Sequence, residues 1–97
     1  MAEKAPREGE VKVLAELLQS DWTHGYALKK RGFSIKTAKR VFVKLFDAGF
    51  SEREERVTKN NQVAVMHRLN RGGRGYATRR IREYELNHEI DILNDSG

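Results

Sequence analysis

The apolar positions in the first half of the chain recur at the spacing of amphipathic helices. Between residues 10 and 20 they follow the i, i+3, i+4, i+7 pattern, which predicts a first helix with one buried face. Thr23 is a candidate N-cap for a short second helix that reaches Lys30, and Gly32 is a candidate stop for it. Residues 1–9 are mostly polar, and we expect them to form a disordered N-terminal arm.

The most informative stretch is the third predicted helix, at residues 34–48. Ser34 is its candidate N-cap, and Gly49 supplies the left-handed residue that ends it. On a helical projection Arg40 lies nearly opposite the apolar residues, and most other cationic residues spread around it. We therefore expect one face in the core and one cationic, exposed face. The predicted core face comprises Ile35, Ala38, Phe42, Leu45 and Phe46.

After this helix the periodicity changes to that of strands. Residues 51–57 give a weak strand signal because glutamates are poor strand formers, whereas residues 63–69 alternate clearly. The polar segment between them contains two asparagines, which tolerate positive φ, so the pattern predicts a β-hairpin with its tip there. We expect a flexible connector at residues 71–75 and a last helix over residues 76–93.

The last predicted helix has two apolar stripes on nearly opposite sides. A contact with the rest of the domain needs only one stripe, so the second predicts a partner helix, most simply from an identical subunit. The alternative is that the second stripe packs on the first helix of the same chain. The first stripe comprises Ala77, Ile81, Tyr84 and His88, and the second comprises Leu86, Ile90 and Leu93.

Composition narrows the class of protein. At 97 residues the chain has little room for both a core and an enclosed catalytic pocket. We find no nucleophile beside a base, no paired carboxylates in an apolar setting and no phosphate loop, so we expect no enzyme. There are no cysteines, and the three histidines lack a ligand spacing, so we expect no metal or other cofactor. Without a signal peptide or membrane span, we expect a soluble, cytoplasmic protein.

Charge is divided unevenly along the chain, although the net value is only +5. Residues 34–50 carry four basic residues against Asp47 alone, a net charge of +3. Residues 68–82 carry six arginines and no acid, and residues 83–97 carry five acids and no lysine or arginine. This asymmetry favours basic surfaces that face a polyanion and an acidic tail kept away from it.

The order of three helices, a hairpin and a closing helix is that of a winged helix-turn-helix. The pattern Ser34-x-x-Thr37-Ala38-x-Arg40-x-Phe42-x-x-Leu45-x-x-x-Gly49-Phe50 resembles the recognition helix of small winged-helix regulators of the MarR, GntR and PadR families. His24-Gly25-Tyr26-Ala27-Leu28 looks most like the start of the second helix of PadR proteins. The resemblance implies a mainly α fold with a small β-hairpin (α+β) and a three-helix core. Residues 10–75 would form the domain, and residues 76–97 a dimerising C-terminal helix with an acidic tail.

The resemblance also implies how the chain would bind double-stranded DNA. The helix at residues 34–48 would lie in the major groove, and the wing at residues 58–62 would touch the backbone or minor groove. Arg40 is the best candidate to read a guanine. Such a protein would be a homodimeric transcriptional regulator, for example a repressor, or a plasmid or virus control protein, nucleoid-associated when bound. The other candidate DNA-binding residues are Ser34, Lys36, Thr37, Lys39, Lys44, Lys59, Asn60, Asn61, Gln62, Arg68, Arg71 and Arg74.

Other interpretations stay open at this point. The same fold could serve as a structural or interaction subunit of a ribosomal or replication assembly. The Arg71-Gly72-Gly73-Arg74-Gly75 run resembles an RGG segment, which keeps RNA as an alternative partner. A basic helix face can also be a merely solvated surface. For the arginines between residues 68 and 82, ion pairs with Glu83, Glu85 and Glu89 are an alternative to nucleic-acid contact.

Overall fold

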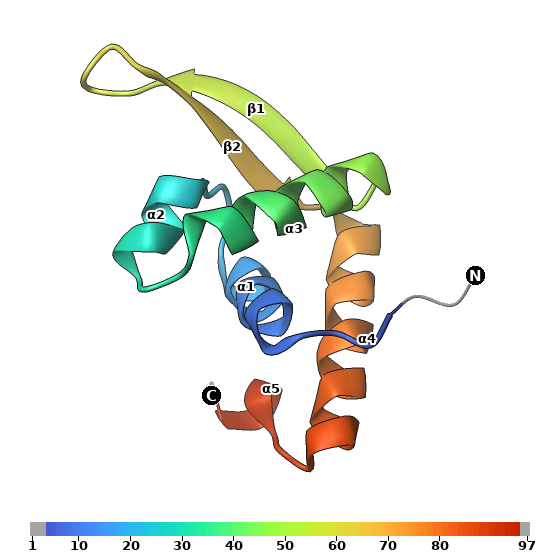
Figure 1. Ribbon diagram of the computed structural model, residues 1–97. Helices are drawn as coiled ribbons and strands as arrows, with labels where there is room; N and C mark the ends of the chain where they lie inside the picture. The colour runs from blue at the N-terminus through green and yellow to red at the C-terminus, as the bar shows by residue number, and fades with distance from the viewer. Residues whose placement is uncertain (1–3, 96–97) are drawn as a thin grey trace.

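A computed structural model describes residues 4–95 as a helical body from which one β-hairpin projects (Figure 1). This is the mainly α fold with a small hairpin that the sequence predicts. None of the helices in the described part of the chain is both long and apolar enough to cross a membrane. The elements are α1 (Glu8–Gln19), α2 (Gly25–Lys30), α3 (Ile35–Asp47), β1 (Ser51–Val57), β2 (Val63–Leu69), α4 (Arg71–His88) and α5 (Ile92–Asp95).

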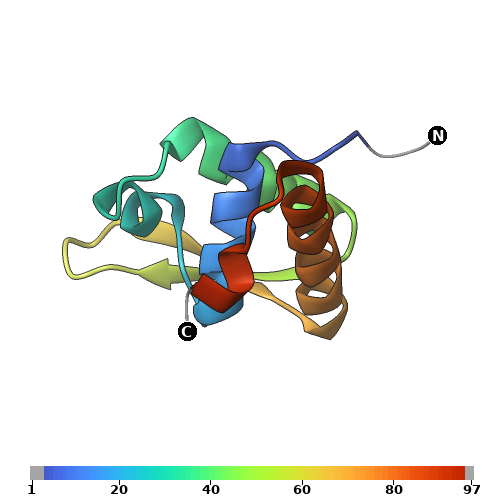
Figure 2. The ribbon, with the colours of Figure 1, turned by 90° about the horizontal axis from the view of Figure 1, so that it is seen from below.

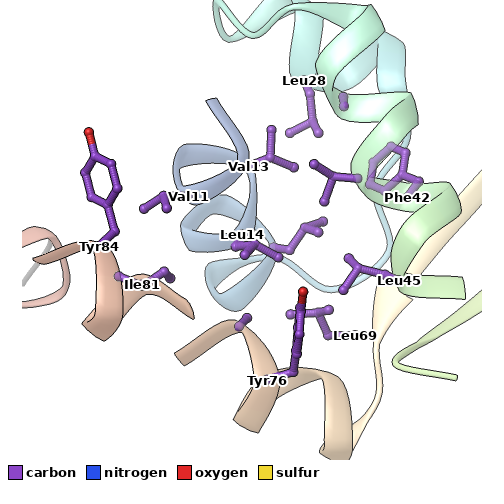
Figure 3. Close-up of a cluster of buried hydrophobic side chains, with 14 residues drawn as sticks. Val11, Val13, Leu14, Leu28, Phe42, Leu45, Leu69, Tyr76, Ile81 and Tyr84 are labelled. Atoms are coloured by element: carbon purple, nitrogen blue, oxygen red, sulfur yellow. The ribbon is translucent and has the colours of Figure 1, made fainter. Parts of the chain in front are cut away.

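The core lies around α1, which sits between α3 and α4 (Figure 3). Leu14 on α1 is fully buried, with Leu45 of α3 on one side and Ile81 of α4 on the other. Burial of each such side chain contributes about 1.5–3 kcal/mol to stability. The amphipathic first helix is confirmed, but its buried face is wider than the predicted spacing, because Val13 is buried as well. The core residues are Val11, Val13, Leu14, Leu17, Leu28, Ala38, Val41, Phe42, Leu45, Leu69, Tyr76, Ala77, Ile81 and Tyr84.

The N-terminal segment differs from the prediction of a disordered arm at residues 1–9. The first helix begins at Glu8, and Pro6 before it is buried. The backbone carbonyl of Lys4 accepts a hydrogen bond of 2.8 Å from the guanidinium of Arg80 on α4. The prediction is therefore wrong for residues 4–9, because an arginine far along the chain holds this segment in place. Residues 1–3 lie outside the described residues.

The α3 helix has the predicted ends, but its buried face is rotated. The Ser34 hydroxyl accepts a hydrogen bond of 3.3 Å from the Thr37 N–H, and Gly49 adopts φ +79° after the last turn. Val41 is buried, whereas Phe46 is 37% exposed. The buried direction is thus turned toward α1 by roughly 40°, at 100° per residue. Phe46 is covered from the other side, because the Arg53 guanidinium lies 4.0 Å from its ring centroid.

The hairpin matches its prediction in bounds and tip. β1 and β2 pair antiparallel from Ser51 opposite Leu69 to Val57 opposite Val63. At the tip Asn61 adopts φ +62°, as an asparagine tolerates. These observations confirm the hairpin that the sequence pattern indicates.

The start of α2 corrects a predicted cap. The ring of His24, not the side chain of Thr23, caps this helix by accepting a 3.3 Å hydrogen bond from the Ala27 N–H. Thr23 instead pairs its backbone with His67, through hydrogen bonds of 2.9 and 2.7 Å. Thr23 thus pairs with the free edge of β2, and this pairing connects the segment before α2 to the hairpin.

The predicted flexible connector at residues 71–75 is in fact the first part of α4. Asn70 caps this helix, because its side chain accepts a 2.8 Å hydrogen bond from the Gly73 N–H. Gly73 packs so closely on the backbone between α3 and β1 that a Cβ there would lie 1.9 Å from the carbonyl oxygen of Phe50. Glycine is therefore required for packing, although its low helix propensity suggests a loop. The RGG-like segment is not a free loop.

The C-terminal helix is shorter than the predicted one at residues 76–93. α4 ends at His88, and Glu89 adopts a left-handed conformation with φ +52°. The chain then turns back, so that α5 packs against the core and lies below α1 in Figure 1 and in front of it in Figure 2. The Glu85 carboxylate caps α5 by accepting hydrogen bonds from the backbone N–H groups of Ile92 (2.6 Å) and Leu93 (3.0 Å). The predicted continuous stripe of Leu86, Ile90 and Leu93 is therefore broken, because Leu93 packs against the core. The predicted acidic tail extends past the described residues, which end at residue 95.

Candidate nucleic-acid interface

The outward face of α3 carries three exposed cations that have no partner in the described part of the chain. The side chains of Lys36, Lys39 and Arg40 form no ion pair or hydrogen bond with any residue between 4 and 95. One acid, Asp47, lies on the same face at the end of the helix, and Val43 lies between it and the cations. Exposed, unpaired cations keep their full charge for an external anion.

Three other predicted DNA-binding residues at this helix make contacts within the chain instead of being free on its outer face. Ser34 is engaged as the N-cap of α3. Thr37 is half-buried beside α1, where its methyl group would lie 3.3 Å from a Cβ at Gly9. Lys44 donates a 3.0 Å hydrogen bond to Glu10. The rotation of α3 toward α1 explains this placement, since it brings this side of the helix against the first turn of α1.

A cleft of about 460 Å³ lies between α3 and the segment before α1. Arg40 and Lys44 of α3 line it together with Lys4 and Arg7. Sequence reasoning missed the last two residues, because it treated residues 1–9 as disordered. Their basic character is visible in the sequence, but their position depends on the packing of this segment against Arg80.

The wing tip is exposed and polar. Lys59, Asn60, Asn61 and Gln62 lie at the end of the hairpin farthest from the helical body (Figure 1). The tip is held closed by Thr58, whose N–H donates to the Gln62 carbonyl at 2.7 Å and whose hydroxyl accepts from the Gln62 N–H at 3.2 Å. This closed turn presents one cation and three polar side chains to the solvent.

Intrachain contacts engage several arginines of the 68–82 cluster. Arg68 donates a 2.8 Å hydrogen bond to Glu52, which raises the pKa of Arg68, and its guanidinium lies 4.4 Å from the Trp22 ring centroid. Arg74 donates to the carbonyl of Leu18 at 2.8 Å, near the end of α1. These two predicted DNA contacts thus have structural partners, whereas Arg71 is exposed at the start of α4.

Two further arginines of this cluster, Arg80 and Arg82, favour the ion-pair alternative. Arg80 is 1% exposed and pairs with Glu10 and Glu83. Arg82 pairs with Glu85 at 3.0 Å. The charge asymmetry of this stretch therefore reflects in part the internal bonding of α4. No three histidine or acidic side chains within residues 4–95 gather as a metal site requires.

The hairpin is fastened to the side of α3 by two ring contacts. The His67 imidazole stacks on Phe42, with ring centroids 4.1 Å apart, and Arg53 lies over Phe46. Burial lowers the pKa of His67, and the nearby Arg53 lowers it further. The wing and α3 therefore form one surface rather than two independent parts.

An exposed apolar pair lies away from this surface, with Leu86 on the last turn of α4 and Ile90 in the turn that follows it. Leu86 is 81% exposed and Ile90 is 47% exposed. They line a shallow depression of about 440 Å³ together with four charged residues: Arg82, Glu85, Glu89 and Asp91.

Solved structures share this arrangement of helices and hairpin. A candidate transcriptional regulator from Thermoplasma acidophilum superimposes with a TM-score of 0.68 and 18% identity, covering 84% of each chain. The chain therefore has the winged helix-turn-helix fold. A candidate transcriptional regulator from Methanosarcina mazei has a TM-score of 0.60 and 15% identity, covering 87% of this chain and 76% of that one. A mutant MarR from E. coli has a TM-score of 0.61 and 18% identity, covering 94% of this chain and 71% of that one.

No protein-family profile and no curated protein sequence matches the chain. The similarity to these winged helix-turn-helix structures, at 15–18% sequence identity, therefore shows a shared fold and does not by itself assign a function. In this fold α2 and α3 are the helix-turn-helix and the β1–β2 hairpin is the wing. The winged helix-turn-helix predicted from the order of elements and the α3 pattern is confirmed.

Proposed function

We propose that this protein is a sequence-specific, double-stranded DNA-binding regulator that inserts α3 into the major groove. The observation that carries this proposal is the set of unpartnered cations on α3: Lys36, Lys39 and Arg40. An α-helix fits the major groove of B-DNA, where an arginine can bond guanine O6 and N7 together. Arg40 is the residue that we assign to this base contact.

The surroundings of α3 support contact with the DNA backbone on both sides. On one side, Lys4, Arg7 and Lys44 line the cleft beside α3, although Lys44 is also bonded to Glu10. On the other side, the wing tip presents Lys59 among polar side chains. Contacts to phosphate orient a protein on the duplex, and contacts to base edges provide specificity.

The proposed regulator is a homodimer joined through the end of α4. Leu86 and Ile90 are exposed there, and a second copy of the same surface would bury both residues. The charged rim of Arg82, Glu85, Glu89 and Asp91 carries both signs, so two copies related by a twofold axis could pair their rims. A dimer of this kind would bind two half-sites about 10 base pairs apart.

The test is fluorescence anisotropy with duplexes selected from a random library, at about 50 mM salt, where phosphate-driven affinity is strong. Arg40→Gln should reduce discrimination between the selected duplex and a scrambled one by roughly 1–3 kcal/mol, as expected for a bidentate base contact. Arg79→Gln, on α4, is the matched control, because it removes the same charge away from α3. We expect it to keep that discrimination.

The result that would overturn the proposal is an absence of duplex binding at this salt concentration. A folded chain that binds neither duplex nor single-stranded DNA would favour the alternative of an interaction subunit in a larger assembly. A preference for RNA over the selected duplex would favour the RNA-binding alternative. Equal effects of both arginine substitutions on discrimination would remove Arg40 from its assigned role.

A further inference from the structure

Val43 is an apolar side chain in the middle of the charged outer face of α3. It is 59% exposed, although Val41 and Phe42 beside it are buried. A β-branched residue loses side-chain freedom in a helix, so valine at an exposed helical position is less favourable than alanine or lysine. Neither core packing nor helix formation therefore accounts for a valine here.

The hairpin leaves Val43 accessible. It covers the adjacent side of α3 through His67 on Phe42 and Arg53 on Phe46. Val43 lies one turn after Lys39, and so on the same side of the helix, beyond the edge of that cover. A partner that approaches the cations of α3 would meet Val43 next.

We propose that Val43 contacts the C5-methyl group of a thymine in the major groove and so determines part of the DNA sequence that is bound. This inference rests on the proposed function. Among the standard bases of DNA, only thymine presents a methyl group in the major groove, and apolar side chains recognise it by contact. The neighbouring Lys36, Lys39 and Arg40 supply the charge that brings a polyanion to this face.

The helix geometry fixes where the thymine lies relative to the guanine assigned to Arg40. Val43 is three positions after Arg40, which corresponds to a rise of about 4.5 Å along the helix axis. Successive base pairs are about 3.4 Å apart. A helix lying along the groove therefore places the two contacts one or two base pairs apart in each half-site.

The experiment replaces each thymine of the selected duplex by uracil, one position at a time, which removes only the methyl group. Loss of one buried methyl should weaken wild-type binding about fourfold, from the usual free energy per buried carbon. We expect this loss at one thymine of the half-site, and we expect Val43→Ala to bind the thymine and uracil duplexes equally. Val43→Thr keeps one methyl group at the contact and should retain much of the discrimination.

The control is Val63→Ala on the wing, where the valine is 63% exposed. Because the thymine methyl is displayed only in the major groove, this variant should keep the fourfold difference. The inference is overturned if the wild type shows no methyl-sensitive thymine, or if Val43→Ala keeps the full difference. Both of those results require binding to the selected duplex. If the wild type binds no duplex at all, the proposed function fails, and the inference fails with it.

Discussion

The imidazole ring of His67 on β2 lies parallel to the phenyl ring of Phe42 on α3, with 4.1 Å between their centroids and 7° between their planes. The Nδ1 atom of His67 is buried and has no hydrogen-bond partner within the described residues. A protonated imidazole at this position would be a partly desolvated cation near Arg53. The stacked pair therefore favours the neutral histidine and couples the position of the wing to the charge on one ring.

This pair predicts a pH-dependent stability. Because the pKa of His67 is lowered in the folded state, folding favours the neutral ring. The stabilisation is complete above the ordinary histidine pKa of about 6.5 and decreases as the pH falls through the folded-state value. Urea unfolding at pH 7.5 and pH 5.0 should show a smaller pH-dependent loss in His67→Phe than in the wild type. An identical loss in both proteins would contradict this role.

Gly73 and Gly75 provide a matched pair for testing the packing of α4. Gly73→Ala should reduce the free energy of unfolding by roughly 1–3 kcal/mol or more, because its Cβ would overlap the Phe50 carbonyl. Gly75→Ala should increase stability by up to about 1 kcal/mol, because its Cβ would meet no atom within 4 Å. Chemical denaturation measures both changes, and equal signs would show that the close approach at Gly73 is not rigid.

How well the sequence predicts each element depends on whether its determinants are local. The ends of α3 and the hairpin tip follow from Ser34, Gly49 and Asn61, which act within a few residues of their own position. The start of α4 does not follow from its own residues, because three glycines indicate a loop. Its helix depends on the Asn70 cap and on contact with Phe50.

In the candidate site, too, some features follow from local sequence and others depend on long-range contacts. That Arg40 is exposed follows from the periodicity of α3 alone. The other arginines look equivalent in sequence. However, Arg74 donates a hydrogen bond to a backbone carbonyl 56 positions earlier in the chain, and Arg80 donates to a carbonyl 76 positions earlier. Such long-range partners decide which cations stay available to a ligand, and no local pattern reveals them. The same holds for Lys4 and Arg7, whose place beside α3 depends on Arg80.

The cap that Glu85 forms on α5 predicts that replacing this residue loosens the C-terminal turn locally. Its buried carboxylate accepts hydrogen bonds from the N–H groups of Ile92 and Leu93 and pairs with Arg82. Glu85→Ala should reduce the free energy of unfolding by about 1–2 kcal/mol, the usual cost of losing a helix cap. Hydrogen exchange should accelerate at the amides of Ile92 and Leu93 and stay unchanged in α3. Asn87→Ala, an exposed substitution on the same helix, should leave those two amides protected.

The exposed apolar pair at the C-terminal end of α4 and in the turn after it predicts the oligomeric state. If Leu86 and Ile90 join two copies, light scattering at micromolar concentration should give the mass of a dimer, and Leu86→Glu should give that of a monomer. Burial of a leucine contributes about 1.5–3 kcal/mol, whereas two facing glutamates would repel each other. Because Leu86 is 81% exposed within the chain, the variant should keep its unfolding midpoint when measured as a monomer. Val57→Glu, an equally drastic change at an exposed wing valine, should leave the dimer intact. A wild type that stays monomeric would contradict the proposed dimer. It would not contradict DNA binding by a single α3, which the anisotropy experiment tests separately.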